Sequence, residues 1–139
     1  KYKVVMKDER ESGLREVLNL GHTVGRAIET VSDYKLLHGE AVSIGLIAQA
    51  KLGEKYGYIS PENVSRVIKL CERAKLPVAI PDYIDKTALV RKLYTDKKVR
   101  DGKLRMVFQK EIGDVMCFGD NDYAKQITEP EIAEVIDEM

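Results

Sequence analysis

The stretch from Ala41 to Leu52 limits the possible fold of this chain more than any other part of the sequence. Apolar residues fill most of its positions and alanine is frequent, whereas a typical strand is only about five or six residues long. A helix that is apolar around most of its circumference has to be buried. The stretch therefore predicts a buried helix. The chain of 139 residues, 44% hydrophobic and 33% charged, is large enough for one globular domain.

The charge balance and the cysteines exclude several classes of protein. Lys and Arg number 23, as do Asp and Glu, so the net charge of zero argues against a dedicated nucleic-acid binder, which needs excess positive charge. No apolar run approaches the ~20 residues of a membrane span, and no signal-peptide pattern opens the chain. Cys71 and Cys117 lie far apart, which argues against a disulfide framework and a cysteine-based zinc site. We therefore expect a cytoplasmic protein.

Helical periodicity and helix-end signals cover most of the chain. Apolar residues recur at three- and four-residue steps in several segments. Gly57 predicts a helix stop, and Ser60 followed by Pro61 predicts the N-cap and first position of a new helix. Thr128 is a second predicted N-cap. The predicted helices are Glu9–Thr30, the buried helix over Ala41–Leu52, Val64–Ala74, Lys86–Tyr94 and Glu131–Met139.

The remaining segments predict a small β element. Asp101-Gly102 between the short apolar runs of Val99–Phe108 is a hairpin signal, and Gly113–Phe118 is a candidate short strand. Lys3–Met6 is either a strand or an extended lead-in. The sequence therefore predicts a single domain over residues 1–139 that is mainly α-helical and carries one small β-hairpin.

A row of polar residues follows the first predicted helix at steps of four and three, which places all of them on one helix face. These residues are Glu11, Arg15, Asn19, His22, Arg26 and Glu29. A solvated face with ion pairs is the ordinary explanation of such a row. However, Gly21 and Gly25 on the apolar side each cost about 1 kcal/mol relative to Ala in a helix interior. Their presence indicates that another group approaches this helix closely.

The two histidines of the chain, His22 and His38, are candidate metal ligands. Neutral imidazoles suit zinc or a similar divalent ion, but a catalytic zinc site needs three protein ligands and an open position. Glu40 could be the third ligand or could hydrogen-bond a ligating histidine. Otherwise the third ligand lies outside this chain. Each histidine taken alone is more often structural than a ligand.

The basic cluster Asp96-Lys97-Lys98 is either a charged surface turn or, together with Arg15 and Arg26, a source of cations for a phosphate or carboxylate. Motifs of other mechanisms are absent from the sequence: it contains no Gly-x-Ser-x-Gly, Walker loop, His-Glu-x-x-His or Gly-x-Gly-x-x-Gly.

Four blocks, in this order and spacing, resemble the C-terminal helical domain of 3-dehydroquinate synthase, essentially from end to end: Asp8–Arg15, Leu18–Gly25, Leu37–Val42 and Asp96–Lys98. The resemblance implies the fold of that domain, a helical bundle. It also implies conversion of 3-deoxy-D-arabino-heptulosonate 7-phosphate to 3-dehydroquinate and phosphate in the shikimate pathway. The family uses NAD and a divalent metal, zinc or cobalt, and is commonly dimeric.

The resemblance also implies roles for individual residues. His22 and His38 match the two histidine ligands of the family's metal, whose third ligand is a glutamate of the N-terminal domain. Arg15 and Asn19 match residues that hold substrate oxyanions. The remaining matches are Lys1, a substrate-contacting lysine, Lys97 and Lys98, a basic pair near the same pocket, and Glu11, an acidic residue linked to proton handling.

Arg26 departs from the family pattern, which has a second histidine at this position of the Gly-His-Thr-x-Gly-His motif. In the family that histidine lies near the phosphate and in the proton network. An arginine still binds an oxyanion, but it cannot act as a base near neutral pH. The departure therefore preserves a phosphate-binding role and removes an acid–base role.

The chain begins at Lys1 without an initiator Met, and the family's N-terminal NAD-binding domain is absent from it. We therefore expect a piece of a longer synthase that is inactive alone and binds metal weakly at most. Two alternatives stay open: another sugar-phosphate cyclase, such as a 2-deoxy-scyllo-inosose or valiolone synthase, and a non-catalytic helical interaction module. A polyol dehydrogenase fits less well, because it lacks the block that contains Arg15 and Asn19.

Overall fold

The fold is mainly helical, as the sequence predicts, and a computed structural model describes residues 14–95, 103–119 and 122–139. A 3₁₀ helix, η1, is followed by four α-helices, four short strands and a last helix. These elements are η1 (Leu14–Asn19), α2 (His22–Val31), α3 (His38–Tyr56), α4 (Pro61–Arg73), α5 (Lys86–Thr95), β1 (Leu104–Val107), β2 (Gln109–Glu111), β3 (Asp114–Val115), β4 (Ala124–Ile127) and α6 (Glu129–Glu138). Within these residues, no helix is long and apolar enough to cross a membrane.

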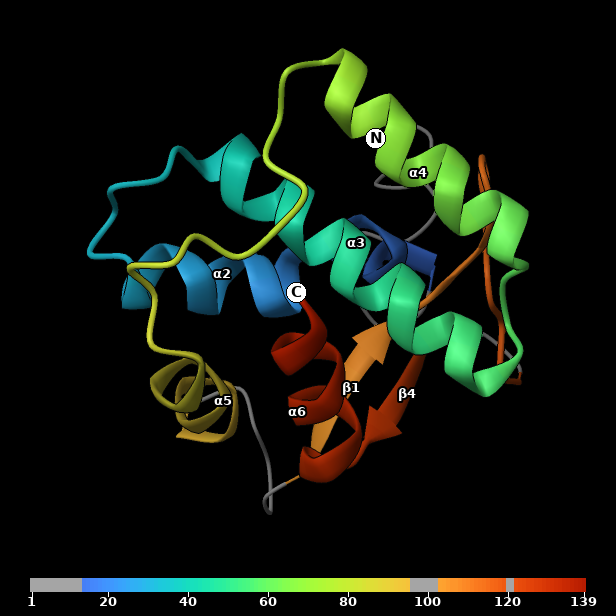
Figure 1. The fold of residues 1–139 in the computed structure, drawn as a ribbon. Helices are drawn as coiled ribbons and strands as arrows, with labels where there is room; N and C mark the ends of the chain where they lie inside the picture. The colour runs from blue at the N-terminus through green and yellow to red at the C-terminus, as the bar shows by residue number, and fades with distance from the viewer. Residues whose placement is uncertain (1–13, 96–102, 120–121) are drawn as a thin grey trace.

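The predicted buried helix is α3, which crosses the middle of the molecule between α2 and α4 (Figure 1). Ala41, Ile44, Ile47 and Ala48 on successive turns are all fully buried. The main core packs around this helix and includes apolar side chains of α2, α5, α6 and the β1–β4 pair. Burial on most sides explains why the segment shows almost no polar face in the sequence.

The contact between α2 and α3 is unusually close because glycines face each other across it. A Cβ atom built on Gly45 would lie 2.0 Å from the carbonyl oxygen of Gly21 and 2.9 Å from the amide nitrogen of Gly25. A Cβ on Gly25 would lie 3.1 Å from the Cα of Val42. The group that approaches the glycines of the first predicted helix is therefore the backbone of α3.

The prediction of one continuous helix over Glu9–Thr30 is wrong in the described part of that range. A 3₁₀ helix ends at Asn19, and α2 begins only at His22, after Gly21 adopts a left-handed conformation with φ 77°. Leu46 of α3 occupies the space beside Gly21, since a Cβ there would lie 2.9 Å from its Cγ. The helix is thus interrupted at Gly21, where the backbone adopts a conformation that favours glycine and Leu46 packs against it. The predicted polar row consequently does not share one helix face.

Helix ends follow the predicted signals with one exception. Gly57 ends α3 with φ 79°, and the Ser60 hydroxyl accepts a hydrogen bond from the Asn63 amide at 3.2 Å at the start of α4. Thr128 precedes α6, but its side chain accepts no backbone N–H. Its hydroxyl donates to the Glu131 carboxylate instead, so Thr128 holds the predicted N-cap position but its side chain does not make the capping hydrogen bond.

Among the described residues, the β structure comprises two short antiparallel pairs, one of which is a small β-hairpin as the sequence predicts. β1 pairs antiparallel with β4, which follows it by about twenty residues, in a register that sets Leu104 opposite Ile127. Both of these side chains are buried in the main core, and this long-range packing is invisible to a local turn signal. The turn at Asp101-Gly102 and the segment Lys3–Met6 lie outside the described residues. A separate hairpin joins β2 to β3, so the predicted strand over Gly113–Phe118 is reduced to Asp114–Val115.

Candidate functional site

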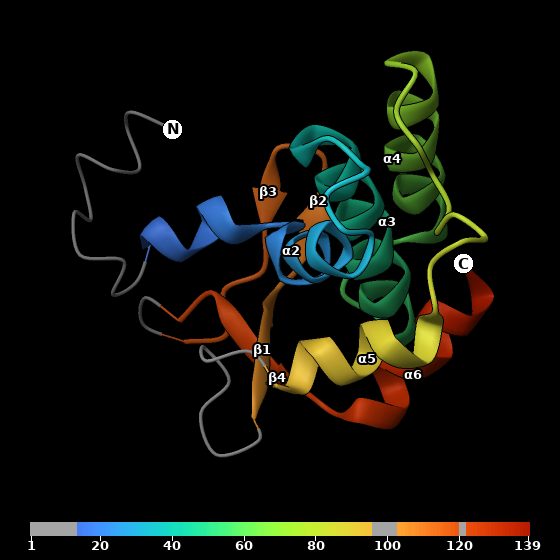
Figure 2. The same ribbon diagram turned by 90° about the vertical axis from the view of Figure 1, so that its left-hand side faces the viewer.

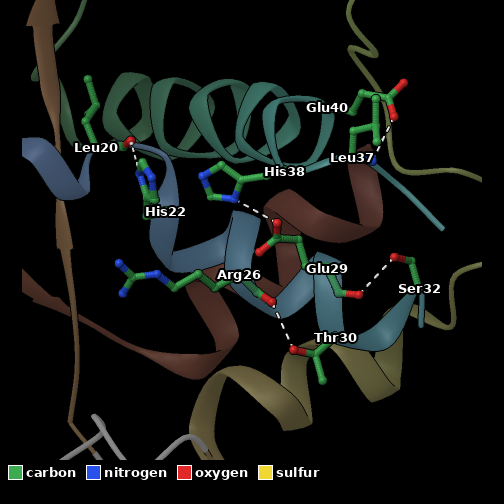
Figure 3. A network of polar contacts seen from close by, with 9 residues as sticks. All are labelled: Leu20, His22, Arg26, Glu29, Thr30, Ser32, Leu37, His38 and Glu40. Atoms are coloured by element: carbon green, nitrogen blue, oxygen red, sulfur yellow. Dashed lines mark hydrogen bonds and ion pairs between the residues drawn. The ribbon is translucent and has the colours of Figure 1, made fainter. Parts of the chain in front are cut away.

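The site is built around His22 and His38, which are the first residues of α2 and α3. The two helices pack closely, and each imidazole projects toward the other, as Figure 3 shows. The ring centroids are 5.3 Å apart and the ring planes are inclined by 53°. In Figure 2, α2 and α3 lie side by side while η1 leads away from them. The structure therefore brings together the two histidines that the sequence places sixteen positions apart.

Both imidazoles are hydrogen-bonded through Nδ1. His22 Nδ1 lies 3.1 Å from the carbonyl oxygen of Leu20, and His38 Nδ1 lies 2.7 Å from Oε1 of Glu29. A carbonyl and a carboxylate only accept hydrogen bonds, so each Nδ1 carries the proton that it donates. In a neutral ring the lone pair is then on Nε2, which is the form in which histidine binds metals. Two such nitrogens are a donor set that fits zinc or cobalt.

Glu40 is engaged away from the imidazoles. Its Oε1 accepts a hydrogen bond from the backbone N–H of Leu37 at 2.8 Å and so closes the first turn of α3. The hydrogen bond to a histidine that the sequence suggested for Glu40 is made instead by Glu29. Within the described ranges, no group of three or more His, Cys, Asp or Glu side chains is arranged to hold a metal ion. These ranges therefore supply two candidate ligands, fewer than a catalytic zinc site requires.

Arg26 lies one helical turn after His22 on α2 and is exposed. In Figure 3 its side chain extends on the His22 side and away from Glu29. In the part of the chain that the structure describes, Arg26 enters no ion pair. An exposed guanidinium beside paired imidazoles can bind an oxyanion such as phosphate.

The structure describes only some of the other predicted site residues. Asn19 is half-buried at the end of η1, just before the left-handed turn at Gly21, so it does not share the α2 face with His22. Arg15 lies in η1, and the structure describes nothing of its side chain. Four predicted residues lie outside the described ranges: Lys1, Glu11, Lys97 and Lys98.

Glu29 is the site residue to which the sequence reasoning gave no role. It stands seven residues after His22, which is two helical turns along the same face of α2. That spacing marked it as part of the polar row, but the row alone does not show that His38 lies opposite. The contact depends on the return of the chain through residues 32–37 and on the close packing of α2 against α3.

Comparison with known proteins identifies the family. Residues 1–99 match the family model described as 3-dehydroquinate synthase C-terminal. The 3-dehydroquinate synthase of Methylococcus capsulatus is 48% identical over 115 residues, which cover 82% of this chain and 32% of that protein. The 3-dehydroquinate synthase of Dichelobacter nodosus is 44% identical over 137 residues, covering 98% of this chain and 36% of that protein. The chain thus spans about a third of the length of these relatives.

Solved structures of related cyclases share the fold. A 2-deoxy-scyllo-inosose synthase complexed with carbaglucose-6-phosphate, NAD⁺ and Co²⁺ superposes with a TM-score of 0.87 at 26% identity, covering 99% of this chain and 38% of that one. The 2-epi-5-epi-valiolone synthase of Streptomyces hygroscopicus, with NAD⁺ and Zn²⁺ bound, gives 0.76 at 25% identity over 96% of this chain and 35% of that one. With the family match and the 44–48% identity above, these findings show that the chain belongs to the 3-dehydroquinate synthase C-terminal family.

Proposed function

We propose that this chain forms the C-terminal part of a 3-dehydroquinate synthase, which converts 3-deoxy-D-arabino-heptulosonate 7-phosphate to 3-dehydroquinate and phosphate. The observation that carries the proposal is the pair of imidazoles of His22 and His38, each with Nδ1 hydrogen-bonded and Nε2 available to a metal. A non-catalytic helical module would have no need for this arrangement. The relatives named 3-dehydroquinate synthase are 44–48% identical, whereas the other cyclases are 25–26% identical, which favours the synthase.

In this proposal His22 and His38 hold a divalent ion, zinc or cobalt. When bound, such a metal supplies Lewis-acid polarisation of a substrate oxygen and orients the substrate. The solved cyclases with Co²⁺ or Zn²⁺ and NAD⁺ support both cofactors for this chain. The remaining metal ligand and the NAD site come from an N-terminal domain outside this chain.

The residues of this chain bind and orient the anionic substrate. The Arg26 guanidinium pairs with a phosphate or carboxylate oxygen, and it stays charged throughout because arginine does not release its proton in proteins. Arg15, Asn19, Lys1 and the pair Lys97 and Lys98 supply further contacts to substrate oxygens, as the family resemblance implies.

Proton transfer requires a group other than Arg26. Glu11 takes part in it by family resemblance, and a phosphate oxygen of the substrate is a second candidate base. The isolated chain would then be inactive, because it lacks the NAD site and one metal ligand. Homodimer formation and a cytoplasmic location complete the proposal.

A chimera tests the proposal. The N-terminal domain of the Methylococcus capsulatus relative is fused to this chain, and phosphate release and 3-dehydroquinate formation are measured with NAD and Zn²⁺ or Co²⁺. We expect turnover that is lost on chelation, in His22→Ala and in His38→Ala, and none from the chain alone. The intact relative serves as the positive control.

Two results would contradict the proposal. One is a folded chimera that turns over glucose 6-phosphate rather than the seven-carbon substrate, which would indicate a cyclase of the 2-deoxy-scyllo-inosose type. The other is a folded chimera with no cyclase activity at all, which would favour the interaction module.

A further inference from the structure

We infer that Glu29 is a positioning residue, whose carboxylate fixes the tautomer and the orientation of the His38 ring so that its Nε2 faces His22. The inference deepens the proposed function and rests on it for the identity of the ion that the two imidazoles share. Figure 3 shows the arrangement: the His38 ring lies between Glu29 and His22, with Nδ1 toward the carboxylate and the other ring nitrogen toward His22.

The contact between Glu29 and His38 is short and charge-assisted. The distance of 2.7 Å from Nδ1 to Oε1 is at the lower end of the range for a hydrogen bond from nitrogen to a carboxylate. Because a carboxylate has no proton to donate at neutral pH, the hydrogen belongs to Nδ1. Glu29 therefore selects one of the two neutral tautomers of His38, the one with its lone pair on Nε2.

Burial shows which partner orients the other. The Glu29 side chain is 16% exposed, whereas the His38 side chain is 59% exposed. Packing against the protein thus fixes the carboxylate, while the imidazole has few neighbouring atoms to fix its rotamer. The hydrogen bond from a fixed acceptor is then the contact that sets the direction of the His38 ring.

His22 does not depend on a side chain in this way. Its Nδ1 donates to the backbone carbonyl of Leu20, in the turn where Gly21 separates η1 from α2. No substitution of a neighbouring side chain removes that carbonyl. The two candidate ligands are therefore oriented by different means, which makes His22 an internal reference for any change at His38.

A purely structural ion pair between α2 and α3 is the competing explanation for Glu29. It would affect thermal stability and leave the tautomer and the metal affinity of a folded variant unchanged. Glu40 provides the control, since it follows His38 by two residues in α3 and also accepts a hydrogen bond, but from the Leu37 amide and away from the imidazoles. Glu29→Gln and Glu29→Ala are compared with Glu40→Gln, with folding checked by circular dichroism.

The experiment reads the tautomers directly. Long-range ¹H–¹⁵N correlation spectra of the metal-free 139-residue chain, at a pH where the rings are neutral, contain two imidazoles, and His22→Ala assigns them. We expect both wild-type rings to be protonated at Nδ1. In Glu29→Ala only His38 should lose this pure tautomer, while Glu40→Gln should change neither ring.

Titration with Co²⁺ supplies the second measurement. We expect Glu29→Ala to weaken Co²⁺ binding about 10–100-fold, the usual effect of removing a group that orients a ligating histidine. Glu29→Gln keeps an acceptor without the charge and should fall between Glu29→Ala and wild type. Glu40→Gln should bind as wild type does.

The outcomes separate the two hypotheses. An unchanged His38 tautomer in folded Glu29→Ala would overturn the role of Glu29, whether or not Co²⁺ binds. Unchanged Co²⁺ binding in both His22→Ala and His38→Ala would instead contradict the metal site of the proposed function. An equal loss of affinity in Glu29→Gln and Glu40→Gln would also overturn the inference, since it would reflect general loss of charge near the site.

Discussion

Replacing Gly45 by alanine should force α2 and α3 apart. The added Cβ would lie 2.0 Å from the carbonyl oxygen of Gly21, whereas a carbon normally comes no closer to such an oxygen than about 3.3 Å. The obstructing atoms are backbone atoms, so no rotation of a side chain relieves the overlap. The helices must separate locally by on the order of 1 Å, beside the residue that precedes His22.

The expected loss of stability follows from two opposing terms. Overpacking a close contact costs about 1–3 kcal/mol, and the short distance at Gly45 places this substitution at the upper end. Alanine in a helix recovers about 1 kcal/mol relative to glycine. The net loss is therefore about 2 kcal/mol, which for a chain of this size lowers the melting temperature by about 6–10 °C.

Gly39→Ala is the matched control for Gly45→Ala. It lies in the same helix, and its Cβ would meet no heavy atom within 4 Å, so we expect unchanged or slightly higher stability. Thermal unfolding of both variants is followed by circular dichroism at 222 nm. A Gly45→Ala variant that melts at or above the wild-type temperature would refute the close contact between α2 and α3.

Two further predictions concern stability. Ser60→Ala should lower the free energy of unfolding, measured in urea, by about 1 kcal/mol, because it removes the hydroxyl that accepts a hydrogen bond from the Asn63 amide. Thr128→Ala should lower it by less, because the Thr128 hydroxyl accepts no hydrogen bond from a backbone amide. Burial raises the pKa of Tyr94 to about 12, and its hydroxyl donates to the carbonyl of Ile127 at 3.2 Å. Since the unfolded pKa is about 10, the unfolded chain loses this proton first, and stability should fall between pH 10 and 12. Unfolding midpoints across this range should fall less steeply in Tyr94→Phe, and equal slopes would contradict the raised pKa.

Local signals predicted much of the helical fold. The apolar run after Glu40 predicted the buried helix α3, Gly57 predicted its end, and Ser60 predicted the start of α4. Each of these features depends on residues within a few positions of one another, so a single sequence contains the information. The close approach to Gly21 and Gly25 was also predicted, although the approaching element was not.

Features that depend on distant residues could not be read locally. The break at Gly21 is stabilised by Leu46 from another helix, and the pairing of Leu104 with Ile127 joins strands separated by the β2–β3 hairpin. Apolar residues recur at helical spacing on both sides of Gly21, so the sequence pattern alone does not mark the break. A continuous helix was therefore the natural but wrong prediction.

The candidate site shows the same division. Spacing placed His22 on a polar row and left the ligand set open, and the family resemblance then paired it with His38. The role of Glu29 required the three-dimensional placement of α2 beside the start of α3.

The decisive measurement is a Co²⁺ titration of the folded chain with both imidazoles observed by NMR, which tests whether His22 and His38 bind the same ion. We predict that both rings respond in parallel and saturate at one Co²⁺ per chain, and that His22→Ala or His38→Ala abolishes the response of the remaining ring at the same concentration. Two rings that saturate independently, at different Co²⁺ concentrations, would contradict it.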